Sequence, residues 1–234
     1  TDYIIDMLIE EQIHAVLING LLDENIFNKL KANDIKIIFR PNTPTTENAI
    51  AAEKLGADVF VATGFDEGGS VPENIIGTFS IVPMIVDVIN IPVIAAGSVS
   101  DVRGVRAAFS LGAEGVYVGS ALIPTLENPA AENVKQYIVD SEAEDLILFR
   151  NLPAYYRSLP GKLARELKEM DENGATNEAL AKHMGAGKNM RLGMVERDTE
   201  NGYVSVGTGI SSIKSIRSVK EVIDDMMQDF NSNT

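Results

Sequence analysis

Two glycine–serine pairs, each directly after a short apolar run, are the residues whose types and spacing best suit chemistry. Gly97-Ser98 follows the run 92–96, and Gly119-Ser120 follows the run 116–118. Runs that are apolar on both faces are typical of buried parallel strands. Neighbouring parallel strands that end in glycine bring bare backbone N–H groups together, and such a nest, backed by helix N-termini, suits a phosphate dianion. The alternative is that each glycine only permits a tight turn between strand and helix.

A long loop, from about residue 63 to 78, carries the second set of candidate residues. Its first part reads Gly64-Phe-Asp-Glu-Gly-Gly-Ser70 and follows another predicted strand. Parallel α/β sheets carry their chemistry at the carboxyl ends of the strands. The paired glycines let backbone approach a ligand closely, and Asp66 and Glu67 can accept hydrogen bonds from hydroxyl or ring N–H groups. An ordinary acidic surface loop is the competing interpretation.

Three further polar residues have weaker claims to function. Arg40 ends a predicted strand, so it either faces a ligand or forms a salt bridge to an acid of a loop. His14 lies at a strand start, the wrong end for catalysis, which indicates a structural role. His183 precedes a glycine turn and is expected to act as a cation at a helix C-terminus.

The elements that must position these residues repeat as a strand followed by a helix. Apolar runs predict strands at residues 13–18, 35–39, 59–62, 92–96 and 116–118. Helices follow them, and the residues that can cap these helices are Asp23, Thr45 or Thr46, and Ser100 or Asp101. The strand starts recur at about 22 residues, the rhythm of βα units with a parallel sheet.

The expected fold class is α/β, a TIM (β/α)8 barrel of which about the last five βα units are present. A closed barrel has eight units, so we expect the first strands to be absent from this sequence; an open doubly wound sheet of five strands is the structural rival. Residues 1–125 are expected to form the C-terminal part of the barrel. Residues 126–200 are expected to form a mainly helical insertion, with a helix over 154–170, and residues 201–234 a return segment and a last helix.

The composition excludes several classes of protein. The net charge is −14, which argues against nucleic acid or an anionic membrane as the main partner. With no cysteine and two histidines, thiolate chemistry is excluded and a histidine-rich metal site is not expected. No run of 18 apolar residues and no signal peptide are visible, so the sequence predicts a soluble cytoplasmic protein.

The motifs resemble those of the nitronate monooxygenase family, formerly called 2-nitropropane dioxygenase, which includes FMN-dependent enoyl-acyl carrier protein reductases. The segment 64–70 resembles the family's Gly-x-Glu-Ala/Ser-Gly-Gly-His loop. The run from Ile91 to Ala121 resembles Pro-Val-Ile-Ala-Ala-Gly-Gly … Gly-Ala-x-x-Val-x-x-Gly-Thr. Residues 183–187 and 204–209 are similar to the tail of the enoyl reductase branch.

The resemblance implies a barrel that binds FMN without a covalent bond. It implies that Gly97, Ser98, Gly119 and Ser120 hold the FMN phosphate, and that the flavin is lined by Asp66, Gly68 and Gly69, with Thr63 near the ring. The family's histidine is replaced by Ser70, the candidate catalytic residue, which cannot act as a base as imidazole does. A serine there can still donate a hydrogen bond to a nitro or carbonyl oxygen.

Three functional hypotheses follow. The first is an FMN oxidoreductase that oxidises alkyl nitronates with O2, or else reduces enoyl thioesters with NAD(P)H and binds acyl carrier protein through a local basic patch. The second is a protein that binds FMN or another phosphorylated ligand without catalysis, because the histidine is lost. The third is a TIM-barrel phosphosugar enzyme, whose phosphate turns are similar. Each of the three hypotheses is compatible with a homodimer.

Overall fold

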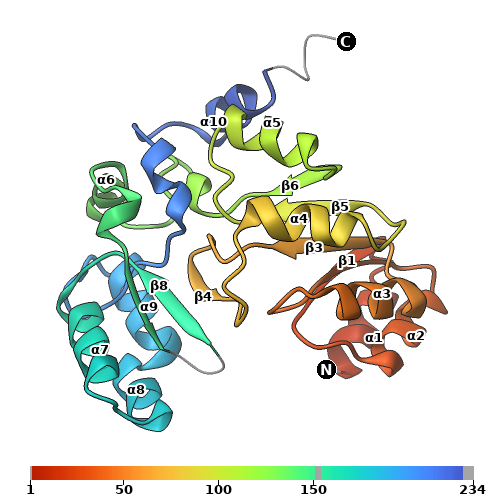
Figure 1. The fold of residues 1–234 in the computed structure, drawn as a ribbon, viewed down its shortest axis with the longest axis horizontal. Coiled ribbons are helices and arrows are strands. Elements are labelled where there is room, and N and C mark those ends of the chain that lie inside the picture. Colours follow the sequence, from red (N-terminus) through yellow and green to blue (C-terminus); the bar gives the residue numbers. More distant parts are fainter. Residues whose placement is uncertain (1, 151–153, 229–234) are drawn as a thin grey trace.

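The main feature of the computed structural model, which describes residues 2–150 and 154–228, is a five-stranded parallel sheet (Figure 1). Its strands are β1 (Ala15–Asn19), β2 (Lys36–Arg40), β3 (Val59–Thr63), β5 (Val93–Ala96) and β6 (Gly115–Tyr117). They lie side by side in chain order, and every neighbouring pair is parallel. A doubly wound sheet would reverse its order at a switch point. The order therefore agrees with consecutive βα units of a barrel, and the predicted strand positions are confirmed.

One helix precedes β1 and the others follow strands, and together they cover one face of the sheet. They are α1 (Asp2–Glu10), α2 (Glu24–Lys31), α3 (Thr46–Leu55), α4 (Thr78–Val86) and α5 (Val102–Ser110). The predicted caps are confirmed: the side chains of Asp23, Thr45 and Asp101 accept hydrogen bonds from the first turns of α2, α3 and α5. The helix α4 starts at Thr78, whereas the sequence predicts this helix over about residues 81–89.

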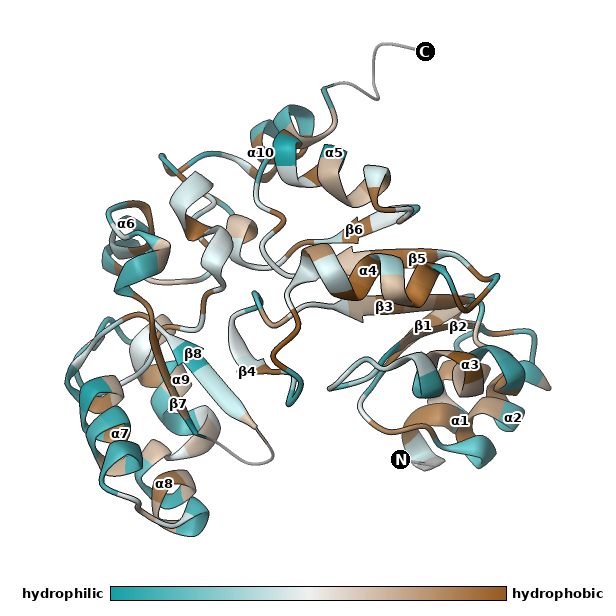
Figure 2. Ribbon diagram, in the orientation of Figure 1, coloured by the Kyte–Doolittle hydropathy of each residue, from teal (hydrophilic) through white to brown (hydrophobic). Residues whose placement is uncertain are grey.

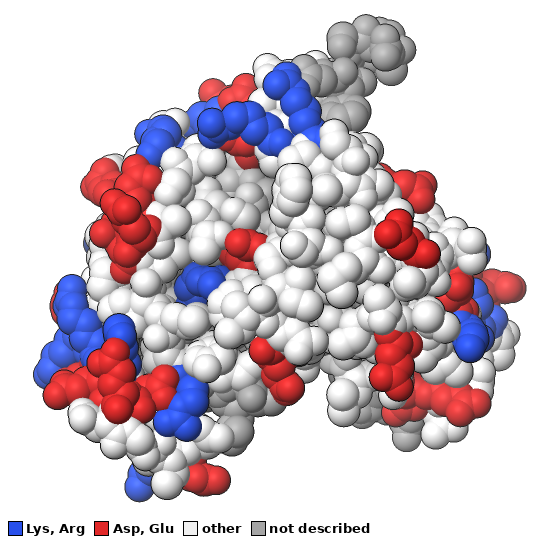
Figure 3. Space-filling model, viewed as in Figure 1, with Lys and Arg blue, Asp and Glu red and all other residues white. Residues whose placement is uncertain are grey.

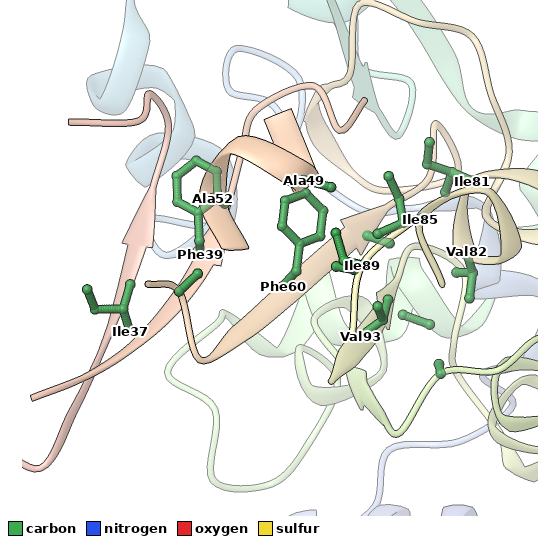
Figure 4. Close-up of a cluster of buried hydrophobic side chains, with 14 of the residues drawn as sticks. Ile37, Phe39, Ala49, Ala52, Phe60, Ile81, Val82, Ile85, Ile89 and Val93 are labelled. Atoms are coloured by element: carbon green, nitrogen blue, oxygen red, sulfur yellow. The ribbon is translucent and has the colours of Figure 1, made fainter. Parts of the chain in front are cut away.

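A hydrophobic core fills the space between this sheet and its helices (Figure 4). Phe39 of β2 and Phe60 of β3 are buried, and their rings pack edge to face with centroids 6.0 Å apart. Phe27 of α2 packs on Phe39 in the same way at 5.7 Å. Hydrophobic residues dominate β3, β5 and α4 (Figure 2). Burying these aromatic rings fixes the sheet against its helices, because each ring removes a large apolar area from water.

The cap of α3 gives a first prediction. Thr45 Oγ1 accepts from the Asn48 backbone N–H at 3.1 Å, and Asn48 Oδ1 accepts from the Thr45 N–H at 3.0 Å. Thr45→Ala removes one half of this capping box and is expected to lower the free energy of unfolding by about 1 kcal/mol. Thr46→Ala, one residue into the helix, is the matched control and should have a smaller effect in urea denaturation. Equal effects of the two variants would contradict the role of the cap.

The opposite face of the same strands carries polar residues at its carboxyl edge. Alternation along a strand turns Arg40, Thr63 and Tyr117 away from the side of Phe39 and Phe60. Thr63 pairs in register with Ala96, and Ala96 pairs with Tyr117, so these three residues form one row. This face therefore brings polar groups from distant strands to one end of the sheet.

A second, three-stranded sheet was not predicted. It consists of β4 (Gly69–Val71), β8 (Tyr155–Ser158) and β7 (Ile147–Arg150), in the order β4-β8-β7 with antiparallel pairing. The predicted helix over 154–170 is wrong in its first part: β8 comes first, and α7 (Lys162–Glu172) begins after Pro160-Gly161. The strand forms because β8 pairs on both sides, and this tertiary pairing overrides the helical spacing of the apolar residues. Residue 153, the proline after which that helix was expected to start, lies outside the described residues.

The remaining helices are α6 (Glu132–Val139), α8 (Asn177–Met184), α9 (Ala186–Met194) and α10 (Val219–Met226), with short turns of 3-10 helix at Ser120–Leu122, Ala143–Asp145 and Thr208–Ser212. Gly185 ends α8 in the left-handed conformation, with φ of 67°, as predicted. A helix was not expected after it, yet α9 begins at once. The division into residues 1–125, 126–200 and 201–234 stays a prediction. Every helix within the described residues is too short or too polar to cross a bilayer.

Candidate functional site

A cavity of about 210 Å³ lies at the carboxyl ends of β5 and β6. It brings together the four residues that the sequence assigned to phosphate binding, namely Gly97, Ser98, Gly119 and Ser120. Glu67 and Gly68 of the long loop line it as well. Ser205, Gly207 and Gly209 also line it; they belong to the extended segment 203–209, called the tail below. The face drawn in Figure 3 is hollowed near its centre, and most of its charged side chains lie toward the periphery.

The turn after β5 exposes backbone donors to this cavity. Gly97 has φ of 100° and Ser98 has φ of 60°, so two successive residues are left-handed, which is uncommon for serine. Among the described residues, none forms a hydrogen bond with Ser98, Val99 or Ser100. Three consecutive N–H groups without a partner, in a turn of this shape, are suited to bind an anion.

Gly119, after β6, leaves space where a side chain would stand. A Cβ atom built on Gly119 would meet no atom within 4 Å. Its neighbour Ser120 is held in place, because its Oγ accepts a hydrogen bond from the Gly207 N–H at 2.8 Å. The glycine therefore keeps the cavity open, and the serine links the cavity wall to the tail.

The N–H groups at the N-terminus of α5, which were expected to help bind an anion, already donate to a side chain of the protein. The Asp101 carboxylate accepts from the N–H groups of Arg103 at 2.9 Å and Gly104 at 3.1 Å. A carboxylate at this position satisfies the first turn of the helix and compensates its dipole. The donors that remain for an anion are therefore those of the turn 98–100.

The structure places the residues predicted to line a flavin in different surroundings. The Asp66 carboxylate accepts from the Thr78 backbone N–H at 2.6 Å and from its hydroxyl at 3.0 Å, so it is used inside the protein at the start of α4. Ser70 is exposed on β4, opposite Tyr156, and does not line the cavity. Gly69 packs near Tyr156 and Ser205, and it does not line the cavity either. Of the loop residues predicted to line the flavin, only Gly68 lies at the cavity.

Glycines of the tail pack against this loop, which the sequence reasoning missed. A Cβ on Gly68 would lie 2.3 Å from the Val206 carbonyl carbon, and one on Gly207 would lie 2.6 Å from the Asp66 carbonyl oxygen. A Cβ on Gly209 would lie 2.3 Å from Ser100 Oγ. No side chain fits at such distances, so these glycines allow the tail to close one side of the cavity. The signals in the sequence were the two glycines at the end of a short extended segment and the similarity of residues 204–209 to the tail of the enoyl reductase branch.

Two arginines and one glutamate form the charged part of the site. Arg40 Nη2 pairs with Glu67 Oε2, and its Nη1 donates to Asn19 Oδ1 at 3.0 Å. The Arg40 guanidinium lies over the Tyr117 ring, 5.5 Å from its centroid. Arg157 of β8 donates to the carbonyl oxygens of Phe65, at 2.6 Å, and of Glu67. The salt-bridge alternative for Arg40 is confirmed, since it pairs with an acid of the loop, whereas a contact of Arg40 with a ligand stays a prediction.

Burial perturbs the charges of this group. Burial raises the pKa of Glu67 to about 7, although the nearby Arg40 and Arg157 act to lower it. Burial also lowers the pKa of Arg157, against the opposing effect of Asp66 and Glu67. The Glu67 carboxyl therefore changes its protonation state near neutral pH, where an acid–base group is most effective.

Two buried polar atoms at this end of the sheet have no hydrogen-bond partner among the described residues. They are Thr63 Oγ1 and Arg40 Nε. Buried polar groups in proteins are almost always paired, so such atoms call for a partner. Together with the unpaired N–H groups at 98–100 and the open space at Gly119, they fit a polar, phosphorylated ligand such as FMN.

The two histidines lie outside the cavity. His14 is exposed directly before β1, at the amino end of the sheet as predicted. His183 is in the last turn of α8, and its Nε2 lies 2.9 Å from Glu166 Oε2. Neither has the position of a catalytic base.

The fold and the cavity define an α/β protein of the TIM-barrel kind with a ligand cavity at the carboxyl ends of its strands. The chain belongs to the nitronate monooxygenase family, since the family model "Nitronate monooxygenase" matches residues 3–229. A probable nitronate monooxygenase of Staphylococcus aureus is 38% identical over 170 residues, which cover 69% of this chain and 45% of the relative. The chain thus spans less than half the length of the curated relatives it matches.

Solved structures agree with this assignment. FabK from Thermotoga maritima superposes with a TM-score of 0.88 and 32% identity, over 98% of this chain and 72% of that one. A nitroalkane oxidase from Streptomyces ansochromogenes superposes with a TM-score of 0.80 over 98% of this chain and 68% of that one. Its 20% identity supports the fold alone. The chain therefore belongs to an oxidoreductase family with a barrel fold.

Proposed function

We propose that this chain carries the FMN site of an oxidoreductase that oxidises alkyl nitronates with O2. The observation that carries the proposal is the cradle formed by the turn 97–100 and by Gly119-Ser120, in which the N–H groups at 98–100 have no partner within residues 2–150 and 154–228. When bound, FMN supplies the electron-accepting chemistry that amino-acid side chains lack. The protein supplies binding, orientation and electrostatics.

Each part of the cavity has a role in this proposal. The N–H groups of residues 98–100 and the space at Gly119 hold the phosphate. The unpaired Thr63 hydroxyl and Arg40 Nε supply donors toward the remainder of the ligand. Arg40 lies beside the cavity, where it holds Glu67 of the cavity wall in an ion pair. The tail at Gly207 and Gly209 excludes water from one side.

The second candidate is reduction of an enoyl thioester by NAD(P)H. It is favoured because the tail segment that resembles the enoyl reductase branch is the one that lines the cavity, at Ser205, Gly207 and Gly209. In that alternative the substrate arrives on acyl carrier protein. The assembly of the whole protein, including a homodimer, stays a proposal.

The test compares the two reactions in the purified protein. Visible flavin absorbance, with FMN released on denaturation, is expected. Oxygen uptake with an alkyl nitronate would support the first candidate, and anaerobic bleaching by NAD(P)H followed by reoxidation with a crotonyl thioester would support the second. Flavin that binds without either reaction would favour a non-catalytic binding protein. A protein that neither retains nor binds FMN would overturn the proposal.

A further inference from the structure

Glu67 is the acid–base side chain of the cavity. Among the described residues that line it, no other carboxylate, histidine or lysine is present. In the motif that this loop resembles, the position of Glu67 holds Ala or Ser, and the position of the histidine holds Ser70 here. Ser70 is exposed and lies outside the cavity lining. The loop therefore has no imidazole at this position, but it places Glu67, a residue with a carboxyl group, in the wall of the cavity.

Contacts fix this carboxyl group and leave one oxygen free. Arg40 holds Oε2, and Arg40 is itself held by Asn19 and lies over the Tyr117 ring. Oε1 forms no hydrogen bond with any described residue. The side chain of Glu67 is 15% exposed, so the free oxygen is in a mostly dry setting. A carboxylate that is positioned and partly desolvated in this way is suited to accept a proton.

The charged groups around Glu67 come from three elements. Arg40 reaches it from β2, and Arg157 reaches the backbone of its loop from β8. Asp66, on the same loop, turns its carboxylate to Thr78. The phenol of Tyr117, on β6, faces Arg40. Burial outweighs the two arginines and raises the pKa of Glu67 to about 7.

We propose that Glu67 is a catalytic base that takes the α-proton of a neutral nitroalkane at Oε1, with Arg40 as its positioning residue. The inference rests on the proposed function, because its product is the nitronate. The C–H bond breaks and an O–H bond forms on Glu67. The C–H electron pair becomes the second bond of C=N, while one N–O π pair moves onto oxygen. No electrons are gained or lost, and Glu67 afterwards releases the proton to water.

Proton exchange tests this step without any oxidation. The protein is mixed anaerobically with nitroethane in D2O, and loss of the α-proton signal is followed by proton NMR against a buffer blank. The wild-type protein should accelerate the loss, and Glu67→Gln should reduce the acceleration about 100-fold, because an amide cannot accept the proton. Glu73→Gln is the matched control in the same loop, where the side chain is exposed, and should keep the wild-type rate.

The pH profile gives a readout that a purely structural role would not change. The base is the ionised form, and the pKa of Glu67 is raised to about 7, so exchange should rise as pH increases through that value and level off above it. In Glu67→Asp the rate of proton exchange should still rise with pH, but the rate should be lower than in the wild-type protein. If Glu67→Gln fails to fold, the Asp variant and the wild-type profile still decide the question.

The outcomes separate this proposal from the proposed function. Wild-type exchange no faster than buffer, or full exchange in Glu67→Gln, would overturn the role of Glu67. Exchange that depends on Glu67 in a protein that binds no FMN would support the base and reject the flavin function. Oxidation of a preformed nitronate that survives in Glu67→Gln, while exchange is lost, would support both, because the nitronate no longer has the proton that Glu67 removes.

Discussion

Gly119→Asp is expected to abolish retention of FMN by the purified protein. A side chain at residue 119 would enter a space with no atom within 4 Å, which is the space proposed for the phosphate. Two unit charges about 4 Å apart repel by about 4 kcal/mol near a protein surface, which corresponds to about 1,000-fold in affinity. The measurement is the flavin content per protein by absorbance, followed by titration of the stripped protein with FMN.

Two control variants separate charge from bulk and position. Gly119→Asn has nearly the same size without the charge and should weaken FMN less than Gly119→Asp. Gly187→Asp adds the same charge at another glycine whose Cβ would meet nothing within 4 Å, in α9 outside the cavity lining, and should keep the flavin. Unchanged flavin content in Gly119→Asp would remove the proposed phosphate site.

Phe60→Ala is expected to lower the free energy of unfolding by about 3–5 kcal/mol. Phe60 is fully buried between the sheet and its helices and packs edge to face with Phe39. The truncated side chain would lose its transfer free energy and leave a cavity that the surrounding residues fill only in part. Urea denaturation, followed by circular dichroism, gives the change.

Phe79→Ala is the matched control for this core variant. Phe79 lies on α4 and is 74% exposed, so its removal should change the free energy of unfolding by less than about 0.5 kcal/mol. Phe60 points away from the carboxyl-end face that carries Thr63 and Tyr117. Folded Phe60→Ala protein should therefore still bind FMN. Similar losses of stability in the two variants would contradict the assignment of the core.

The barrel strands were predictable because their signals are local. Each strand is a short apolar run, and the helix that follows begins with a capping side chain such as Asp23, Thr45 or Asp101. The three-stranded sheet was not predictable in this way. Its strands β4 and β8 are far apart in sequence, and nothing in the composition of Gly69–Val71 indicates its partner. The two tyrosines of β8 favour a strand by themselves, but they precede a segment with helical spacing, and their strand partners are distant in sequence.

The same distinction holds for the site. Gly97 and Gly119 were found because they end successive strands, and their meeting follows from a parallel sheet. The contact of Arg157 with the Phe65 carbonyl joins residues 92 positions apart. The contact of Thr208 with the Asp66 carbonyl joins residues 142 positions apart. Such contacts depend on how the tail folds back onto the loop. The glycines of the tail are therefore visible in the sequence, but their close packing against the loop could not be predicted from it.

The glycine contacts of the tail have a consequence for biosynthesis. Gly207 and Gly209 close against the loop at Gly68 and the turn at Ser98–Ser100, and both line the cavity. A nascent chain therefore cannot offer the finished binding cavity until Gly209 has left the ribosomal exit tunnel. On the proposed function, capture of FMN is thus expected late in maturation, and a premature stop codon before residue 207 would yield a barrel segment that lacks one wall of the binding cavity.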